Sequence, residues 1–129
     1  MVSLNCIGQI AVNVLDVSRA VAFYRDVLGM TFLFELPTMG FFDCGGIRLI
    51  LSKAETPEFD HPASIIYYKV DDIQQTFESL SQQGVEFVSP PSLVAPMPDH
   101  DLWMAFFRDP DQNALALMSE VRRTSGATS

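Results

Sequence analysis

The two histidines of the chain are the side chains whose chemistry is easiest to name, because imidazole titrates near neutrality and can carry a proton. His100 stands between Asp99 and Asp101, and either carboxylate could orient its ring for general acid–base catalysis. His100 is therefore the candidate catalytic residue, with a polar surface turn as the alternative. His61 precedes Pro62 in a stretch rich in proline and acidic residues, where an exposed histidine is commonplace.

Four polar or charged residues, Gln9, Asn13, Arg48 and Lys69, fall within otherwise apolar strand patterns. Such groups are costly in sealed packing, so they favour a cavity over a dry core filled by side chains. Alternate residues of a strand point to the same face, and extending that alternation gives the expected lining. The candidate ligand-binding residues are Gln9, Asn13, Arg48, Ile50, Ile65, Tyr67, Trp103, Phe107 and Ala116.

The elements that must position these residues occur twice. The helical apolar set Val17, Val21 and Tyr24 returns 56 residues later as Ile73, Phe77 and Leu80. The pair Phe41-Phe42 returns as Phe106-Phe107. A repeat made of one helix and several strands implies two similar units that pack their open faces together, with a ligand cleft between them.

Each half predicts the same order of elements. The first half predicts a strand at 7–14, a helix capped by Asp16 and ended by Gly29, and strands at 31–36, 40–44 and 47–53. The second predicts a strand at 64–70, a helix from Asp72 to Gln83, and strands at 85–89, 102–108 and 114–119. We therefore expect one domain over 1–129, with module one at 4–53, a linker at 54–62, module two at 63–120 and a frayed tail at 121–129.

The second half differs from the first mainly by an insertion at 90–101, which holds four of the eight prolines. Long loops with this much proline are often lids or rims over a site. The indole of Trp103 would then offer a flat surface to a planar or cationic ligand, and His100 would reach the polar end of that ligand. The alternative is an ordinary surface loop.

Composition excludes several classes of protein. The net charge of −8 and the sequence pI near 4.4 argue against nucleic-acid binding. No apolar run approaches membrane length, and a strand pattern begins too near the N-terminus to leave room for a signal peptide. Cys6 and Cys44 lie in apolar strand patterns without metal-like or redox spacing. These features predict a reduced, cytoplasmic protein without a disulfide.

Three motifs give the chain a family resemblance that covers residues 6–120. They are the helix segment at 16–29, Val70-Asp71-Asp72 and the turn Asp109-Pro110-Asp111-Gln112-Asn113. In these the chain resembles the vicinal-oxygen-chelate superfamily of glyoxalase, bleomycin-resistance and extradiol-dioxygenase proteins. The resemblance implies an α+β fold in which two βαβββ modules form a curved, barrel-like mixed sheet with helices on the outer face. It also implies a homodimer.

Catalytic members of that superfamily hold a divalent metal with four inward-facing His, Glu or Gln side chains. By alignment, those positions here are Gln9, Ile50, Ile65 and Ala116. Only Gln9 offers a lone pair, and one amide oxygen does not hold a divalent ion. We therefore expect these four residues to lie near one another around the cavity, with no metal and no other cofactor.

The leading functional hypothesis is a small-molecule binder like the drug-sequestering bleomycin-resistance branch. Sequestration needs only a largely apolar, aromatic cavity with a polar rim, and the acidic balance of the chain favours cationic ligands. The sequence also leaves an enzymatic function open. The rival is a metal-dependent lyase, isomerase or dioxygenase with an unconventional site that includes Gln9 and His100. A further alternative is a structural or regulatory module whose cavity is filled.

Overall fold

The computed structural model describes Val2, residues 4–54 and residues 64–122 of the chain. It consists of two compact units, Met1–Ser64 and Ile65–Ser129, and each unit is described by itself. His61, most of the predicted linker and residues 123–129 of the predicted tail lie outside the described residues. No helix within the described ranges is long and apolar enough to cross a membrane.

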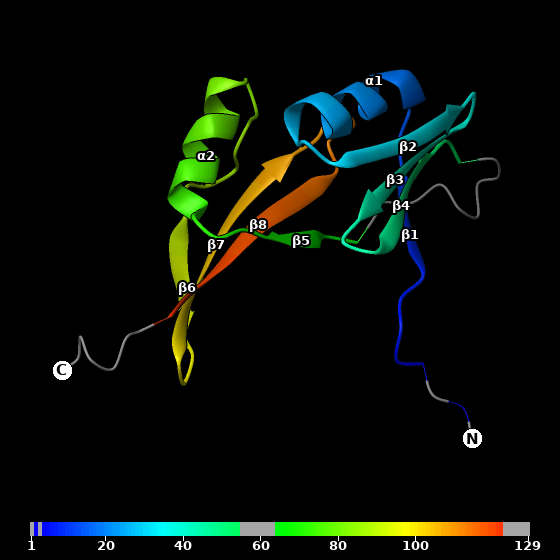
Figure 1. The fold of residues 1–129 in the computed structure, drawn as a ribbon. Coiled ribbons are helices and arrows are strands. Elements are labelled where there is room, and N and C mark those ends of the chain that lie inside the picture. Colours follow the sequence, from blue (N-terminus) through cyan, green and yellow to red (C-terminus); the bar gives the residue numbers. More distant parts are fainter. Residues whose placement is uncertain (1, 3, 55–63, 123–129) are drawn as a thin grey trace. The chain divides into compact units, whose positions relative to one another are not determined.

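The first unit is a four-stranded mixed sheet with a helical segment over one face (Figure 1). Its elements are β1 (Gln9–Asn13), α1 (Val17–Ala22) continuing as the π-helical turn η1 (Phe23–Val27), β2 (Thr31–Leu36), β3 (Met39–Cys44) and β4 (Ile47–Ser52). The strand order is β1-β4-β3-β2. The pair β1–β4 is parallel and the other pairs are antiparallel.

The second unit repeats this architecture. Its elements are β5 (Ile66–Lys69), α2 (Ile73–Gln82), β6 (Ser92–Pro96), β7 (His100–Arg108) and β8 (Ala114–Arg122). The strand order is β5-β8-β7-β6, with β5–β8 parallel and the other pairs antiparallel. The α+β class and the repeated order of elements are confirmed. The described strands form two open four-stranded sheets and do not close into a barrel.

The helices begin and end where the sequence predicts. The side chains of Asp16 and Asp72 each accept a hydrogen bond of 3.0 Å from the backbone N–H three residues further on. An aspartate in this position satisfies a backbone donor that the first turn leaves unpaired. After each helix the chain passes through a glycine with positive φ, Gly29 at +70° and Gly84 at +90°, as helix C-termini often require.

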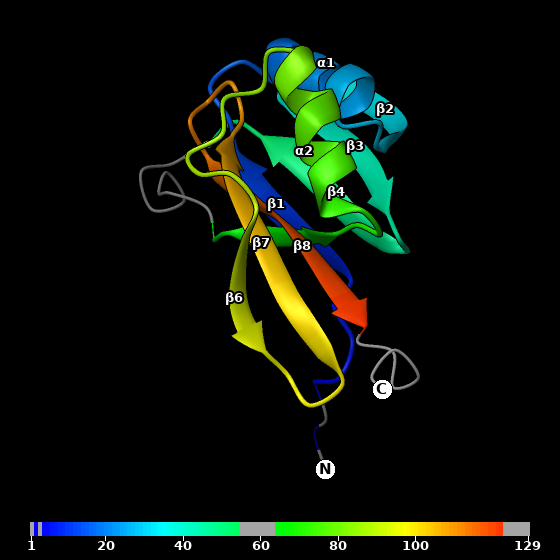
Figure 2. The same cartoon turned by 90° about the vertical axis from the view of Figure 1, so that its left-hand side faces the viewer.

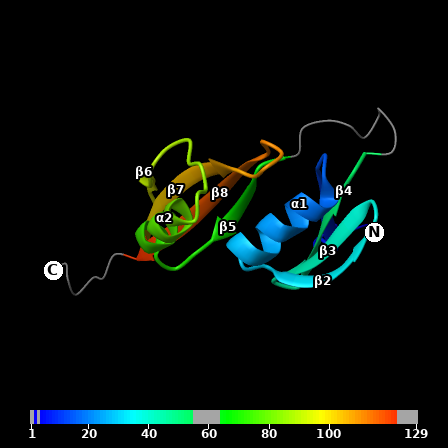
Figure 3. The same cartoon turned by 90° about the horizontal axis from the view of Figure 1, so that it is seen from above.

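Each helix packs its apolar stripe against the central strands of its own sheet. Figure 3 shows the α1 ribbon beside the strands of the first sheet. In the first unit the buried set is Val12, Val17, Val21, Tyr24, Phe42, Leu49 and Leu51. In the second it is Ile73, Leu80, Ala105, Phe107, Leu115 and Leu117. Full burial of one such large apolar side chain contributes about 1.5–3 kcal/mol, so this contact holds each unit together.

The second unit departs from prediction around its prolines. The strand predicted at 85–89 is reduced to a single bridge between Phe87 and Phe107, because Pro90 and Pro91 lack the N–H that a sheet ladder needs. The prediction of a loop at 90–101 is wrong, because this segment contains β6 and the start of β7. Figure 2 shows this β6–β7 hairpin extending past α2. The strand β8 also continues through Arg122, two residues into the predicted frayed tail.

Gly40 on β3 has no room for a side chain beneath α1. A Cβ atom added there would overlap Cγ2 of Val21. We therefore expect Gly40→Ala to lower the free energy of unfolding by about 1–3 kcal/mol, the usual cost of overpacking. Urea denaturation measures this change.

Gly8→Ala is the matched control, because nothing lies within 4 Å of its added Cβ, and it should change stability by less than about 1 kcal/mol. Val21→Ala in the Gly40→Ala background should recover part of the loss. Equal effects of the two glycine substitutions would contradict the packing argument.

Candidate functional site

The face of the first sheet that points away from α1 is its open face. In the register of the parallel pair, Gln9 faces Arg48 and Ala11 faces Ile50. Because in-register neighbours point to the same side of a sheet, Gln9, Asn13, Arg48 and Ile50 share the open face. The intervening Val12 is buried on the α1 side.

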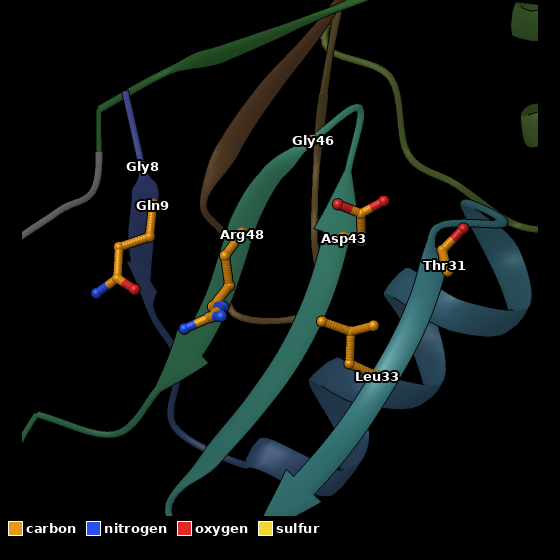
Figure 4. A pocket seen from close by; sticks show the side chains of 7 residues that line it. All are labelled: Gly8, Gln9, Thr31, Leu33, Asp43, Gly46 and Arg48. Atoms are coloured by element: carbon orange, nitrogen blue, oxygen red, sulfur yellow. The ribbon is translucent and has the colours of Figure 1, made fainter. Parts of the chain in front are cut away.

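A hollow of about 650 Å³ lies on the first unit and spans all four of its strands (Figure 4). Its lining consists of Gly8, Gln9, Thr31, Leu33, Asp43, Gly46 and Arg48. The Gln9 and Arg48 side chains project from neighbouring strands on the same side of the sheet. The predicted lining named these two, whereas Thr31, Leu33 and Asp43 were missed.

The charged groups of this hollow are open to a ligand. Asp43 and Arg48 are cross-strand neighbours, and neither side chain makes a hydrogen bond or ion pair with any other described residue. A guanidinium can donate two parallel hydrogen bonds to a carboxylate or phosphate. Gln9 adds an amide donor and acceptor, and Leu33, 46% exposed, adds apolar contact. The hollow is therefore suited to a small polar molecule that carries an anionic group.

An aromatic pair adjoins the hollow on the open face. The rings of Phe34 and Phe41 stack with centroids 4.4 Å apart and an interplanar angle of 18°, and Phe34 is 50% exposed. A register shift between Phe32 and Phe34 brings Phe34 opposite Phe41, which in turn faces Ile50. This bulge places aromatic surface beside the polar groups.

The open face of the second sheet is more apolar at its centre. Tyr67 and Phe106 both lie opposite Ala116, on β5 and β7 respectively, and their rings meet edge to face at 5.9 Å. Ala116 is fully buried, whereas Tyr67 is 43% exposed. Ile65 immediately precedes β5 and is 44% exposed. The pairing brings Tyr67 and Ala116 together and adds Phe106, which the sequence argument missed.

The predicted face was wrong for Trp103 and Phe107. Phe107 pairs with Leu115 and Trp103 pairs with Ser119, so these residues lie on the α2 side. Phe107 is fully buried. The cause is a one-residue error in alternation along β7, which exchanges the two faces of a strand. The repeat held the correct signal, because buried Phe42 corresponds to Phe107 and open-face Phe41 to Phe106.

His100 lies at the start of β7 in a chain of charged neighbours. Its Nδ1 is 2.7 Å from Asp99 Oδ1, and its Nε2 is 3.9 Å from Glu120 Oε2. Arg122 donates to Asp99 at 3.1 Å, and Lys69 pairs with Glu120 at 3.2 Å. The hydrogen bond with His100, and then the charge of Arg122, lower the pKa of Asp99. The contact of 2.7 Å makes Asp99 a carboxylate that orients the imidazole.

His100 and Trp103 cannot contact one ligand group from the same side of β7. His100 pairs with Arg122 and Trp103 with Ser119, and residues three apart on a strand point to opposite faces. His100 stays a candidate proton carrier on the open face, because its ring is oriented and its side chain is 18% exposed. Trp103 lies on the α2 side, where it lines a different hollow.

The side chains at the predicted metal positions do not fit a divalent ion. Gln9 and Ile50 lie on the open face of the first unit, and Ala116 lies on that of the second. Aliphatic side chains supply no lone pair. Within residues 4–54 and 64–122, no group of three His, Cys, Asp or Glu side chains is placed to hold a metal ion.

Two βαβββ units, each with an open sheet face opposite its helix, define the fold class of this chain. The model of the Glyoxalase/Bleomycin resistance protein/Dioxygenase superfamily matches residues 6–117. The chain therefore belongs to this superfamily.

Three individual relatives are between 19% and 36% identical to this chain. The uncharacterized protein YraH of Bacillus subtilis (strain 168) is 28% identical over 126 residues, covering 84% of this chain and 94% of that protein. Metallothiol transferase FosB of Staphylococcus haemolyticus (strain JCSC1435) is 36% identical over 70 residues, covering 54% of this chain and 48% of that protein. A glyoxalase/bleomycin resistance protein/dioxygenase from Alicyclobacillus acidocaldarius has the same fold, with a TM-score of 0.70, 19% identity and coverage of 93% and 95%.

His100→Ala should raise the pKa of Asp99 toward the ordinary value of an aspartate, since the largest cause of its lowering is then removed. A lowered carboxyl pKa stabilises the folded state above the unfolded pKa, and this contribution is lost as pH falls through the folded pKa. The wild-type protein should therefore lose more stability on acidification than His100→Ala does. Carboxyl ¹³C NMR titration measures the pKa directly.

Arg122→Ala provides the comparison, because its charge ranks below the His100 hydrogen bond among the causes that lower this pKa. It should raise the pKa of Asp99 by a smaller amount. An unchanged Asp99 titration in His100→Ala would show that the contact does not persist in solution.

Proposed function

We propose that this protein binds a small organic molecule carrying an anionic group on the open face of its first sheet, without a metal ion. The observation that carries the proposal is the hollow of about 650 Å³ in which Arg48 and Asp43 have no partner among the described residues. Membership of the superfamily that includes bleomycin-resistance proteins also supports the proposal. Ligand sequestration needs a shaped surface and no reaction.

The anionic group would lie against Arg48, whose planar fork of donors matches a carboxylate or phosphate. A donor group of the ligand would reach Asp43, one strand away. The aromatic or aliphatic body of the ligand would then cover Leu33 and the stacked Phe34–Phe41 pair. This assignment replaces the cationic ligand that the overall acidity favoured, because net charge is a weaker guide than the groups lining the site.

The second candidate is a metal-dependent enzyme of the superfamily. The similarity to metallothiol transferase FosB over about half of each chain favours it. The donor set argues against it, because Ile50, Ile65 and Ala116 stand where catalytic members carry ligands. We therefore expect no reaction that passes through a metal at these positions.

The third candidate, a structural module with a filled cavity, is disfavoured by exposure. In the first unit, Leu33 and Phe34 keep 46% and 50% of their surface exposed. Side chains of that unit would bury these two residues if they filled its hollow.

We infer that the protein works in the reducing cytoplasm. Cys6 and Cys44 are both free thiols. Burial, and then the nearby Asp43 charge, raise the pKa of Cys44, so this thiol stays protonated and weakly reactive at neutral pH. Recovery of the protein in a secreted or membrane fraction of its host would contradict this inference.

We also propose a homodimer in solution. The edge strand β2 exposes Leu36, and the edge strand β6 exposes Leu93 and Val94. Apolar side chains on an unpaired edge favour a partner that covers them. Light scattering at micromolar concentration should report twice the 14.4 kDa chain mass, and a monomer would refute the proposal.

Arg48→Ala tests the proposed binding site. Thermal-shift screening of small carboxylates and phosphates with aromatic bodies should identify compounds that raise the melting temperature of the wild-type protein. Loss of a charge-assisted hydrogen-bond partner should weaken their binding by about 1.5–3 kcal/mol in Arg48→Ala. Calorimetry on both proteins measures the difference.

Arg25→Ala is the matched control, because Arg25 is in the same unit but pairs with Asp26 at 2.8 Å and does not line the hollow. It should bind the same compounds as the wild type. Elemental analysis should find no stoichiometric divalent metal. A stoichiometric ion that is lost in Gln9→Ala would favour the metal-dependent enzyme, and equal losses in both arginine variants would refute the assignment to Arg48.

A further inference from the structure

The only tryptophan of the chain lies in a second hollow, which belongs to the second unit alone. This hollow has a volume of about 430 Å³. Ile73, Pro91, Trp103 and Val121 form its apolar part, and Asp71 and Ser119 are among its polar residues. It lies on the α2 side of the sheet, so it is separate from the open face of that sheet.

Trp103 stands outside the scaffold that the two units share. Phe107 corresponds to Phe42 at an offset of 65 (107 − 42), which makes Ala105 correspond to Gly40 and places Trp103 at position 38, before β3 begins. Trp103 is thus on the extended part of β7, within the β6–β7 hairpin, where it pairs with Leu93 of β6. The Trp103 side chain is half-buried and lines the hollow.

The charge of the hollow is negative. Asp71 and Asp72 line it, and no Lys, Arg or His is among its described lining residues. The Asp72 carboxylate caps α2, whereas the Asp71 carboxylate has no partner among the described residues. Two carboxylates outweigh the roughly half positive charge of a helix N-terminus, so a cation is favoured over an anion here.

The loop that carries Asp71 is fixed to the floor of the hollow. The buried Ser119 hydroxyl donates to the Asp71 carbonyl oxygen at 3.2 Å, and the Asp72 cap holds the next residue against α2. The carboxylate and the indole are therefore held on one rigid frame. A rigid frame lowers the entropy lost when a ligand binds.

The geometry points to a binding site for small organic ammonium ions in this hollow. The cationic group would lie over the Trp103 ring, which attracts it through the ring quadrupole, and beside the Asp71 carboxylate. The alkyl groups of the ion would contact Pro91, Ile73 and Val121. A site of this size with one aromatic ring should have a dissociation constant on the order of 1 mM for a simple ion.

The emission of Trp103 reports on this site directly, because the chain has one tryptophan. We expect tetramethylammonium chloride to change that emission in a saturable way. Sodium chloride at equal ionic strength and uncharged tert-butanol should not. Asp71→Asn should raise the dissociation constant about three- to tenfold, as expected for one charge removed at contact distance near a surface.

Asp26→Asn is the matched control, since Asp26 pairs with Arg25 in the first unit and lines neither hollow, and it should leave the dissociation constant unchanged. Trp103→Leu removes the reporter, so saturation-transfer NMR of the tetramethylammonium protons follows that variant and should show loss of binding. Four results would each overturn the site: emission that does not saturate, an equal response to tert-butanol, an unchanged constant in Asp71→Asn, or an equal loss in Asp26→Asn. Circular dichroism establishes that each variant is folded.

Discussion

Each sheet can give only one face to its helix, and this constraint decides which side chains are left on the open face. Because a strand alternates its side chains with period 2, burying Val12, Leu49 and Leu51 under α1 turns Gln9, Arg48 and Ile50 to the other side. The contact with the helix buries the core side chains of the unit, and the open face takes no part in that contact. Polar and charged residues on the open face therefore cost the fold little, and they are free to differ between members that share it.

The repeat made most of the fold predictable from the sequence. The aspartate caps, the glycine stops and the buried stripe of α1 are local signals, and the structure places them where the sequence indicates. The errors fell where local signals conflict. Pro90 and Pro91 end one strand and allow another to begin at Ser92, which reads in the sequence as a loop. The long strand β7 has apolar residues on both faces, so alternation alone could not tell Phe106 from Phe107.

The site was less predictable than the fold for a physical reason. The hollow of the first unit needs the edge strand β2 to turn Thr31 and Leu33 toward it, and a bulge then brings Phe34 onto the same face. A bulge breaks the period on which face assignment depends, and the segment 31–36 carries no glycine or proline to mark one. Gln9 and Arg48 were found because they are polar residues in regular strands. Leu33 and Phe34 were missed because apolar residues in a strand give no such signal.

Two similar units thus present two different chemical surfaces. In the first unit, α1 lies over Gly40 and the open face carries Arg48 beside Asp43. In the second unit, β7 is longer than its counterpart β3, and the added residues carry Trp103 on the helix side and His100 on the open face. Neither addition touches the buried pairs that the repeat preserves. Duplication of a scaffold whose stability lies on one face permits this divergence, because new side chains can appear on the other face or beyond the helix without removing any contact that holds the unit together.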